Sequence, residues 1–231
     1  MELLDAVKCF LVFVVSTSIH EAAHSWVAFK LGDDTAYRGG QVTLDPSPHI
    51  IREPIGMVVV PLLSVLLGGW MVGWASTPYD PAWALRSPRR AALMSLAGPT
   101  ANLLLVITAA LVIRGGVALH IFDAPNSVGF THIVHAVNGG VAIFFAKLLS
   151  IIFSLNLLLG AFNLLPVPPL DGASLPLLFL SRNLAQRVFT LTRHPTFRTV
   201  GLLIAWRGFG ALYHPIQLSA VHLLYPETSY Y

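Results

Sequence analysis

Long stretches without charge constrain this chain more than any other feature. No charged residue lies in 54–79 or 91–113, and each of the stretches 9–29, 148–181 and 199–226 contains a single charge. Every stretch is at least as long as the roughly 20 apolar residues that cross a bilayer. The whole chain is 55% hydrophobic and 11% charged, whereas soluble domains are about 45–50% apolar and about 25% charged. This composition excludes a water-soluble monomer.

Basic residues between the apolar stretches predict the orientation of the chain. They follow the first stretch and flank the later ones: Arg38, Arg52, Arg86, Arg89, Arg90, Arg182, Arg187, Arg193 and Arg198. Because cytoplasmic loops carry an excess of Lys and Arg, we expect inward spans at about 6–29 and 140–164 and outward spans at about 92–113 and 200–224, with 115–137 outside. Topology thereby explains the formal charge of +3, and no nucleic-acid partner is expected.

Two segments do not fit a simple count of crossings. Residues 54–75 are apolar enough to cross. However, the arginines on both sides of the segment are assigned to the cytoplasm, and prolines and glycines interrupt any helix. We expect a re-entrant segment here, with a tight pair of crossings as the alternative. Residues 31–53, with Gly32, Gly39 and Gly40 among Thr, Tyr, Val and Gln, are typical of a short β-hairpin or an irregular loop.

These observations predict the fold class and the domain organisation. We expect an all-α polytopic membrane protein with four to six transmembrane helices, a small membrane-associated β-hairpin and a re-entrant segment. Residues 1–231 should form one integral-membrane domain, with a core at 6–182 and a basic loop and last transmembrane helix at 183–231. Acidic residues precede the first apolar stretch, unlike a signal peptide, so we expect this stretch to be retained. The single cysteine, Cys9, excludes internal disulfides and cysteine-based metal sites.

The first apolar stretch contains His20 and His24 with Glu21 between them. Residues i and i+4 share one face of an α-helix, so both imidazoles can reach one metal ion, and Glu21 projects from the adjacent face. This is the arrangement of zinc proteases. The alternative is a pair of hydrogen-bonded histidines in a helix interface. Each ionisable group at bilayer depth costs about 2.5–3.5 kcal/mol, so three of them within one turn favour a shared role in binding a metal.

Asp171 is the candidate for a third metal ligand. A catalytic zinc site uses three protein ligands and leaves one position for water. Asp171 is the only charged residue between Lys147 and Arg182, and three prolines at 166–169 precede it. Because proline cannot propagate a helix, the inward span at about 140–164 should end there, in surroundings of protein or a watery cavity. The alternative is that Asp171 caps a helix at about 173–181.

Three motifs in this order resemble the site-2 protease family of intramembrane zinc metalloproteases. They are His-Glu-Ala-Ala-His at 20–24, Gly-Pro-Thr-Ala-Asn at 98–102, and the run 163–172, which begins Asn-Leu-Leu-Pro and ends Leu-Asp-Gly. The resemblance is to the compact form without PDZ or CBS domains. It implies zinc as the cofactor, with the ligands and base that the family's motifs supply: His20, His24 and Asp171 as ligands, and Glu21 as the catalytic base.

The same resemblance implies roles for two asparagines within these motifs. Asn163 matches an asparagine that helps to hold substrate, and Asn102 belongs to a packing motif of the second core helix. For both residues an interhelical hydrogen bond, worth about 0.6 kcal/mol on average, is the alternative.

Together these features predict an intramembrane zinc metalloprotease that hydrolyses peptide bonds within or near transmembrane helices, as in regulated intramembrane proteolysis. A transmembrane helix hides its carbonyl groups in hydrogen bonds, so the substrate must unwind, and we expect 39–44, with Gly39 and Gly40, to accept it as an added strand. The expected partners are the lipid bilayer and a transmembrane protein or peptide. The expected location is a prokaryotic cell membrane, with the active site toward the cytoplasm. The alternatives are a membrane metal transporter and an inactive relative that binds membrane helices.

Overall fold

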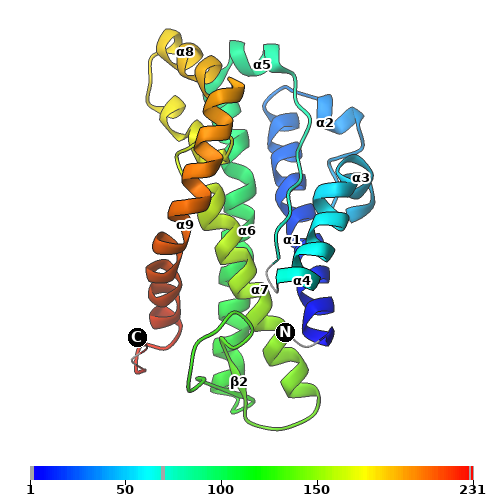
Figure 1. Cartoon of the computed structure of the whole chain (residues 1–231), viewed down its shortest axis with the longest axis vertical. Coiled ribbons are helices and arrows are strands. Elements are labelled where there is room, and N and C mark those ends of the chain that lie inside the picture. Colours follow the sequence, from blue (N-terminus) through cyan, green and yellow to red (C-terminus); the bar gives the residue numbers. More distant parts are fainter. Residues whose placement is uncertain (1–2, 69–70, 229, 231) are drawn as a thin grey trace.

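Long helices form the body of the molecule. The computed structural model describes residues 3–68, 71–228 and 230. The helices α1 (Leu3–Lys30), α6 (Pro88–Ala118), α7 (Val141–Asn163) and α9 (Pro195–Leu224) run along its long axis (Figure 1). Shorter elements connect them: α2 (Thr35–Arg38), α3 (Pro46–Arg52), the π-helical turn η1 (Ile55–Val59), α4 (Val60–Gly68), α5 (Pro81–Arg86), β1 (Phe122–Asp123), β2 (His135–Ala136), the 3-10 helix η2 (Asp171–Leu178) and α8 (Arg182–Thr192).

Three of the helices in the described residues, α1, α6 and α7, are long and apolar enough to cross a membrane. A fourth span results if the bent pair Pro46–Arg52 and Ile55–Val65, which meet at 110°, is counted as one. The prediction of an all-α polytopic membrane protein is therefore confirmed. The helix predicted as the last span, α9, is 30 residues long, but Arg207 and His214 interrupt its apolar sequence.

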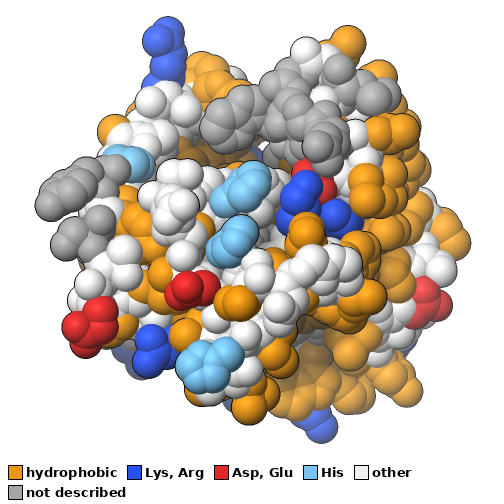
Figure 2. Space-filling model, turned by 90° about the horizontal axis from the view of Figure 1, so that it is seen from below, with side chains coloured by type: hydrophobic (Ala, Val, Ile, Leu, Met, Phe, Trp, Pro, Cys, Tyr) orange, Lys and Arg blue, Asp and Glu red, His pale blue; other side chains and the backbone are white. Residues whose placement is uncertain are grey.

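The flanks of the molecule are apolar and its ends are polar. Large hydrophobic side chains point outward from the long helices, among them Leu104 at 57%, Leu111 at 68% and Trp206 at 65% exposure. Figure 2 looks along the bundle at the end that carries β1 and β2, where histidines and charged side chains lie among hydrophobic ones. An apolar belt of this kind is what a bilayer covers.

The segment predicted to be re-entrant leaves one end of the molecule and returns to it. Residues 71–80, which follow η1 and α4, run back in an extended conformation (Figure 1), and residues 69–70 of the predicted segment lie outside the described residues. The Nε of Arg52 donates to the carbonyl of Ser76 at 3.0 Å, which joins the two ends of the segment. Gly56 and Gly73 cross in close contact, because a Cβ on Gly73 would lie 2.6 Å from the Gly56 carbonyl oxygen. This is the geometry of a re-entrant segment.

The expected β-hairpin is not found in 31–53, where the structure has α2 and α3 joined by a turn. The reason is a helix-start signal: the Asp45 carboxylate accepts from the backbone N–H of Ser47 at 2.9 Å, and Pro46 occupies the first helical position. Within the described residues the only sheet pairs β1 with β2, in the segment predicted to lie outside.

The elements after α7 also differ in detail from expectation. The 3-10 helix η2 begins at Asp171 itself, where a helix at about 173–181 was one alternative. The region predicted as a basic loop contains α8, which packs Ala185 and Phe189 against α5 and α6.

A buried ion cluster joins α1 to α7 at the end that carries the β-sheet. The Asp5 carboxylate accepts from Lys8 at 3.0 Å and from Lys147 at 2.9 Å, and its side chain is 8% exposed.

Replacing Asp5 with Asn leaves two cations facing a neutral amide, so we expect a loss of about 3 kcal/mol in stability, measured by thermal unfolding in detergent micelles. The matched control is Asp34→Asn, because the Asp34–Arg38 pair is exposed, and its loss should cost less than about 1 kcal/mol. Equal losses in the two variants would contradict this assignment.

Candidate active site

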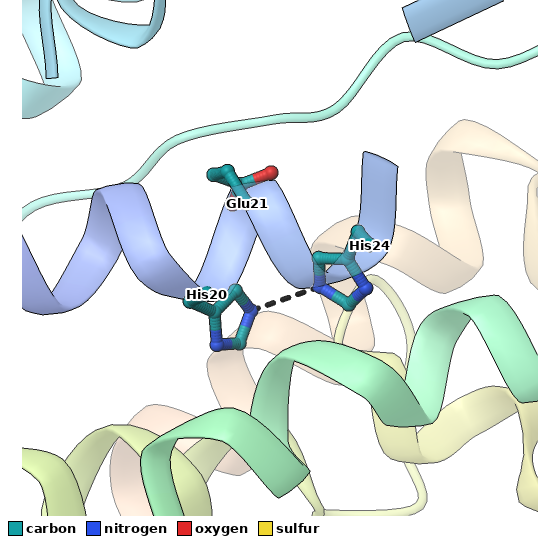
Figure 3. Close-up of side chains that lie close together, drawn as sticks. All are labelled: His20, Glu21 and His24. Carbon is teal, nitrogen blue, oxygen red and sulfur yellow. Dashed lines mark hydrogen bonds between the residues drawn. The ribbon is translucent and has the colours of Figure 1, made fainter. Parts of the chain in front are cut away.

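Helix α1 places His20, Glu21 and His24 together inside the bundle. The Nε2 atoms of the two histidines are 2.9 Å apart, as the dashed line in Figure 3 marks. One carboxylate oxygen of Glu21 and one ring nitrogen of each histidine lie within 4.8 Å of one another. All three residues are 5–6% exposed. The i, i+4 spacing thus produces the predicted cluster.

The loop after α7 brings Asp171 to the two histidines. Prolines at 166–169 end the helical path, and η2 then packs against α6 through Leu177, which is 1% exposed. The Oδ2 atom of Asp171 lies 3.3 Å from the Nε2 atom of His20 and 3.3 Å from that of His24. Asp171 is the first residue of η2, and the N-cap position before it is occupied by Leu170, so Asp171 does not stand where the capping alternative requires it.

The tautomer of His24 follows from its partner on α6. Its Nδ1 lies 2.7 Å from the backbone carbonyl of Met94. A carbonyl only accepts, so Nδ1 carries the proton and the Nε2 atom of a neutral ring presents a lone pair.

A chain of buried amides sets the tautomer of His20. The amide of Asn156 donates to the carbonyl of Ile152 at 2.9 Å, so its Oδ1 faces Asn102 and accepts from that residue's amide at 2.8 Å. The Oδ1 atom of Asn102 is then left to accept from Nδ1 of His20 at 2.5 Å. His20 therefore also presents a lone pair at Nε2. Asn102 thus makes the interhelical hydrogen bond that was the alternative for it, and it also orients a candidate ligand.

Three electron-pair donors consequently face one another without a proton between them. The short Nε2–Nε2 contact joins two acceptors, and the buried Oδ2 of Asp171 has no hydrogen-bond donor among the described residues. Buried acceptors in this arrangement repel unless a cation lies among them. Their separations of 2.9, 3.3 and 3.3 Å are close to the edge of about 3.3 Å of a tetrahedron with zinc–ligand bonds of about 2.0 Å. Two imidazoles and one carboxylate therefore fit a zinc ion.

Gly98 on α6 leaves the space that these atoms need. A Cβ at this position would lie 2.4 Å from the Nε2 atoms of both His20 and His24. Any side chain here would displace the imidazoles, which explains the glycine of the Gly-Pro-Thr-Ala-Asn run in physical terms.

Several functional contacts were missed from the sequence. Asn156 and Met94 orient the histidines, and Thr77 donates to the Oε2 atom of Glu21 at 2.7 Å. A signal existed for Asn156, since it is a polar residue in the apolar α7, two helical turns before Asn163 on the same face. Thr77 lies in an irregular segment and carried no such signal.

The other predicted site residues lie apart from these contacts. Asn163 ends α7, and its amide donates to the carbonyl of Leu159 in its own helix at 3.0 Å. Gly39 and Gly40 lie in the exposed turn between α2 and α3, where Gly40 has φ +69°. The expected strand at 39–44 is absent, so the structure offers no strand edge there.

Comparison with known proteins places the chain among peptidases. The model of the family described as "Peptidase family M50" matches residues 8–206. The chain is 36% identical over 163 residues to "Putative zinc metalloprotease YwhC" of Bacillus subtilis (strain 168), covering 70% of this chain and 64% of that protein. It is 33% identical over 160 residues to "Putative zinc metalloprotease Rip2" of Mycobacterium tuberculosis (strain ATCC 25618 / H37Rv), covering 69% and 52%. No solved structure matches the chain.

The matched part spans 52–64% of the length of these curated relatives. The family match takes in His20, His24 and Asp171 together with the helices that position them. The chain therefore belongs to peptidase family M50, the site-2 protease family that its three motifs predicted.

Proposed function

We infer that this chain is an intramembrane zinc metalloprotease that hydrolyses peptide bonds within or near the transmembrane helices of membrane proteins, as in regulated intramembrane proteolysis. The observation that carries this function is the convergence of His20, His24 and Asp171, as three electron-pair donors, beside the carboxylate of Glu21. Family membership and the zinc metalloprotease names of the relatives support it.

The residues of the site have distinct roles in this proposal. His20, His24 and Asp171 would hold zinc. The positive charge of zinc would lower the pKa of water, so that it loses a proton readily and becomes a nucleophile, and would polarise the scissile carbonyl. Glu21 accepts the proton of the attacking water and delivers it to the leaving amine nitrogen. The amide chain through Asn102 keeps the Nε2 lone pair of His20 directed at the site.

The substrate is a membrane-spanning segment that unwinds before attack. Its carbonyl groups are otherwise occupied by helical hydrogen bonds. Asn163 and the exposed turn at Gly39 and Gly40 are the proposed substrate contacts, without the strand pairing that a hairpin would have offered.

The bilayer is the second partner, and the site faces the cytoplasm of a prokaryotic cell. His24 lies within two turns of the C-terminal end of α1, at the end of the molecule where α5 and α8 also lie (Figure 1). This end carries most of the arginines, including Arg86, Arg182 and Arg187. Basic residues gather on the cytoplasmic side of membrane proteins.

Glu21→Gln tests the assignment of the base. The amide cannot accept the proton, so we expect the rate of cleavage of a reporter transmembrane helix to fall by about 100-fold or more, while the zinc content per chain stays that of the wild type. Both quantities are measured on purified protein in the same micelles or liposomes. Unchanged cleavage would refute the role of Glu21, and bound zinc without cleavage by the wild type would favour a transporter or an inactive relative.

Gly98→Ala tests the metal site without altering a ligand. The added Cβ would collide with both Nε2 atoms, so we expect the protein to lose most of its zinc, as measured by elemental analysis after dialysis against a weak chelator. Gly115→Ala is the matched control, because a Cβ at this position of the same helix meets nothing within 4 Å. Full zinc occupancy in Gly98→Ala would contradict the proposed geometry.

A further inference from the structure

The extended residues 71–80 pass directly beside Glu21. In Figure 3 this segment, in pale blue-green, runs past the side of α1 that carries Glu21, whereas His20 and His24 point toward α6 on the other side. We call residues 71–80 the strap. The strap is not helical, and its position is set by contacts with the elements around it.

The strap is anchored on both sides of Thr77. Before Thr77, the Ser76 hydroxyl donates to the Glu53 carboxylate at 2.5 Å, and the backbone N–H of Trp74 donates to the carbonyl of Gly56 at 3.0 Å. After it, the backbone N–H of Asp80 donates to the Asp33 carboxylate at 2.8 Å. Thr77 lies between these anchors, so its place beside α1 is fixed from both directions.

Thr77 makes its polar contacts with one turn of α1. Its Oγ1 lies 2.7 Å from Oε2 of Glu21, 3.0 Å from the Glu21 carbonyl oxygen and 3.3 Å from Oγ of Ser25. A threonine hydroxyl has one proton to give. The carboxylate oxygen is the nearest acceptor and the charged one, so the proton points to Oε2.

This hydrogen bond leaves the two oxygens of Glu21 in different situations. Oε2 is engaged by Thr77, whereas none of the described residues donates to Oε1. A carboxylate held at one oxygen keeps a fixed rotamer, and its other oxygen is available to take a proton.

We propose that Thr77 is a positioning residue for catalysis, which holds Oε2 of Glu21 so that Oε1 accepts the proton of the attacking water. The inference rests on the proposed function of Glu21 as the base. The strap is then a part of the active site that the zinc-binding motifs do not include, because it delivers Thr77 from a segment of irregular structure.

Thr77→Val tests the proposal, since valine keeps the shape and removes the hydroxyl. We expect kcat on the reporter helix to fall by about 10-fold to 100-fold, the effect of losing a hydrogen bond to a charged group. KM and the zinc content should stay within about twofold of the wild type. Thr77→Ser restores the hydroxyl and should recover most of the lost kcat. Thr108→Val is the matched control, because the exposed Thr108 hydroxyl on α6 donates only within its own helix, to the carbonyl of Leu104, and this variant should retain its kcat.

A second measurement separates positioning from a general role in stability. Thr77→Val should lower the Tm of the wild-type protein at least twice as much as it lowers the Tm of Glu21→Ala, in which the carboxylate partner is already gone. Equal shifts in the two backgrounds, or equal losses of kcat in Thr77→Val and Thr108→Val, would overturn the proposal. Full activity of Thr77→Val beside an inactive Glu21→Gln would refute the role of Thr77 alone, whereas full activity of Glu21→Gln would refute the proposed function.

Discussion

Two imidazole lone pairs and one carboxylate oxygen face each other in the interior of a helix bundle, and the rest of the structure is arranged around them. Buried acceptors without a proton between them are strongly unfavourable in a medium of low polarity. The partners of His20 and His24 on α6 nevertheless fix both rings so that each presents its lone pair. A cation resolves this conflict, and the donor set and spacing fit zinc.

The surrounding helices supply what this arrangement needs. Helix α6 contributes a glycine that makes room, a carbonyl and an amide that orient the rings, and α7 contributes Asn156, which fixes the direction of that amide. The amide of Asn156 also donates to the Ser16 hydroxyl at 2.9 Å, so the chain of hydrogen bonds returns to α1. These polar groups lie among apolar side chains, and each is satisfied by another helix. The same contacts that orient the site therefore hold α1, α6 and α7 together.

The sequence was informative where one physical rule dominates. Apolar length predicted α1, α6 and α7, the i, i+4 rule predicted the histidine pair, and the isolated charge of Asp171 predicted that it lies with them. The hairpin at 31–53 was wrong, because the cap formed by Asp45 before Pro46 starts a helix and outweighs the glycine-rich composition. Asn156 could be noticed as a polar residue in an apolar helix, but its partner Asn102 is 54 residues away in the chain, and Thr77, whose partner Glu21 is 56 residues away, carried no signal at all. Spacing along one element does not reveal such contacts.

The proposed function requires that His20, His24 and Asp171 bind one zinc ion. X-ray absorption at the zinc edge, on protein purified in micelles and containing its metal, tests this most directly. We expect one zinc per chain, a nitrogen and oxygen shell at about 2.0–2.1 Å, and the multiple scattering of two imidazole rings. A spectrum with fewer than two imidazoles, or a protein that does not retain zinc when the ion is supplied, would contradict it.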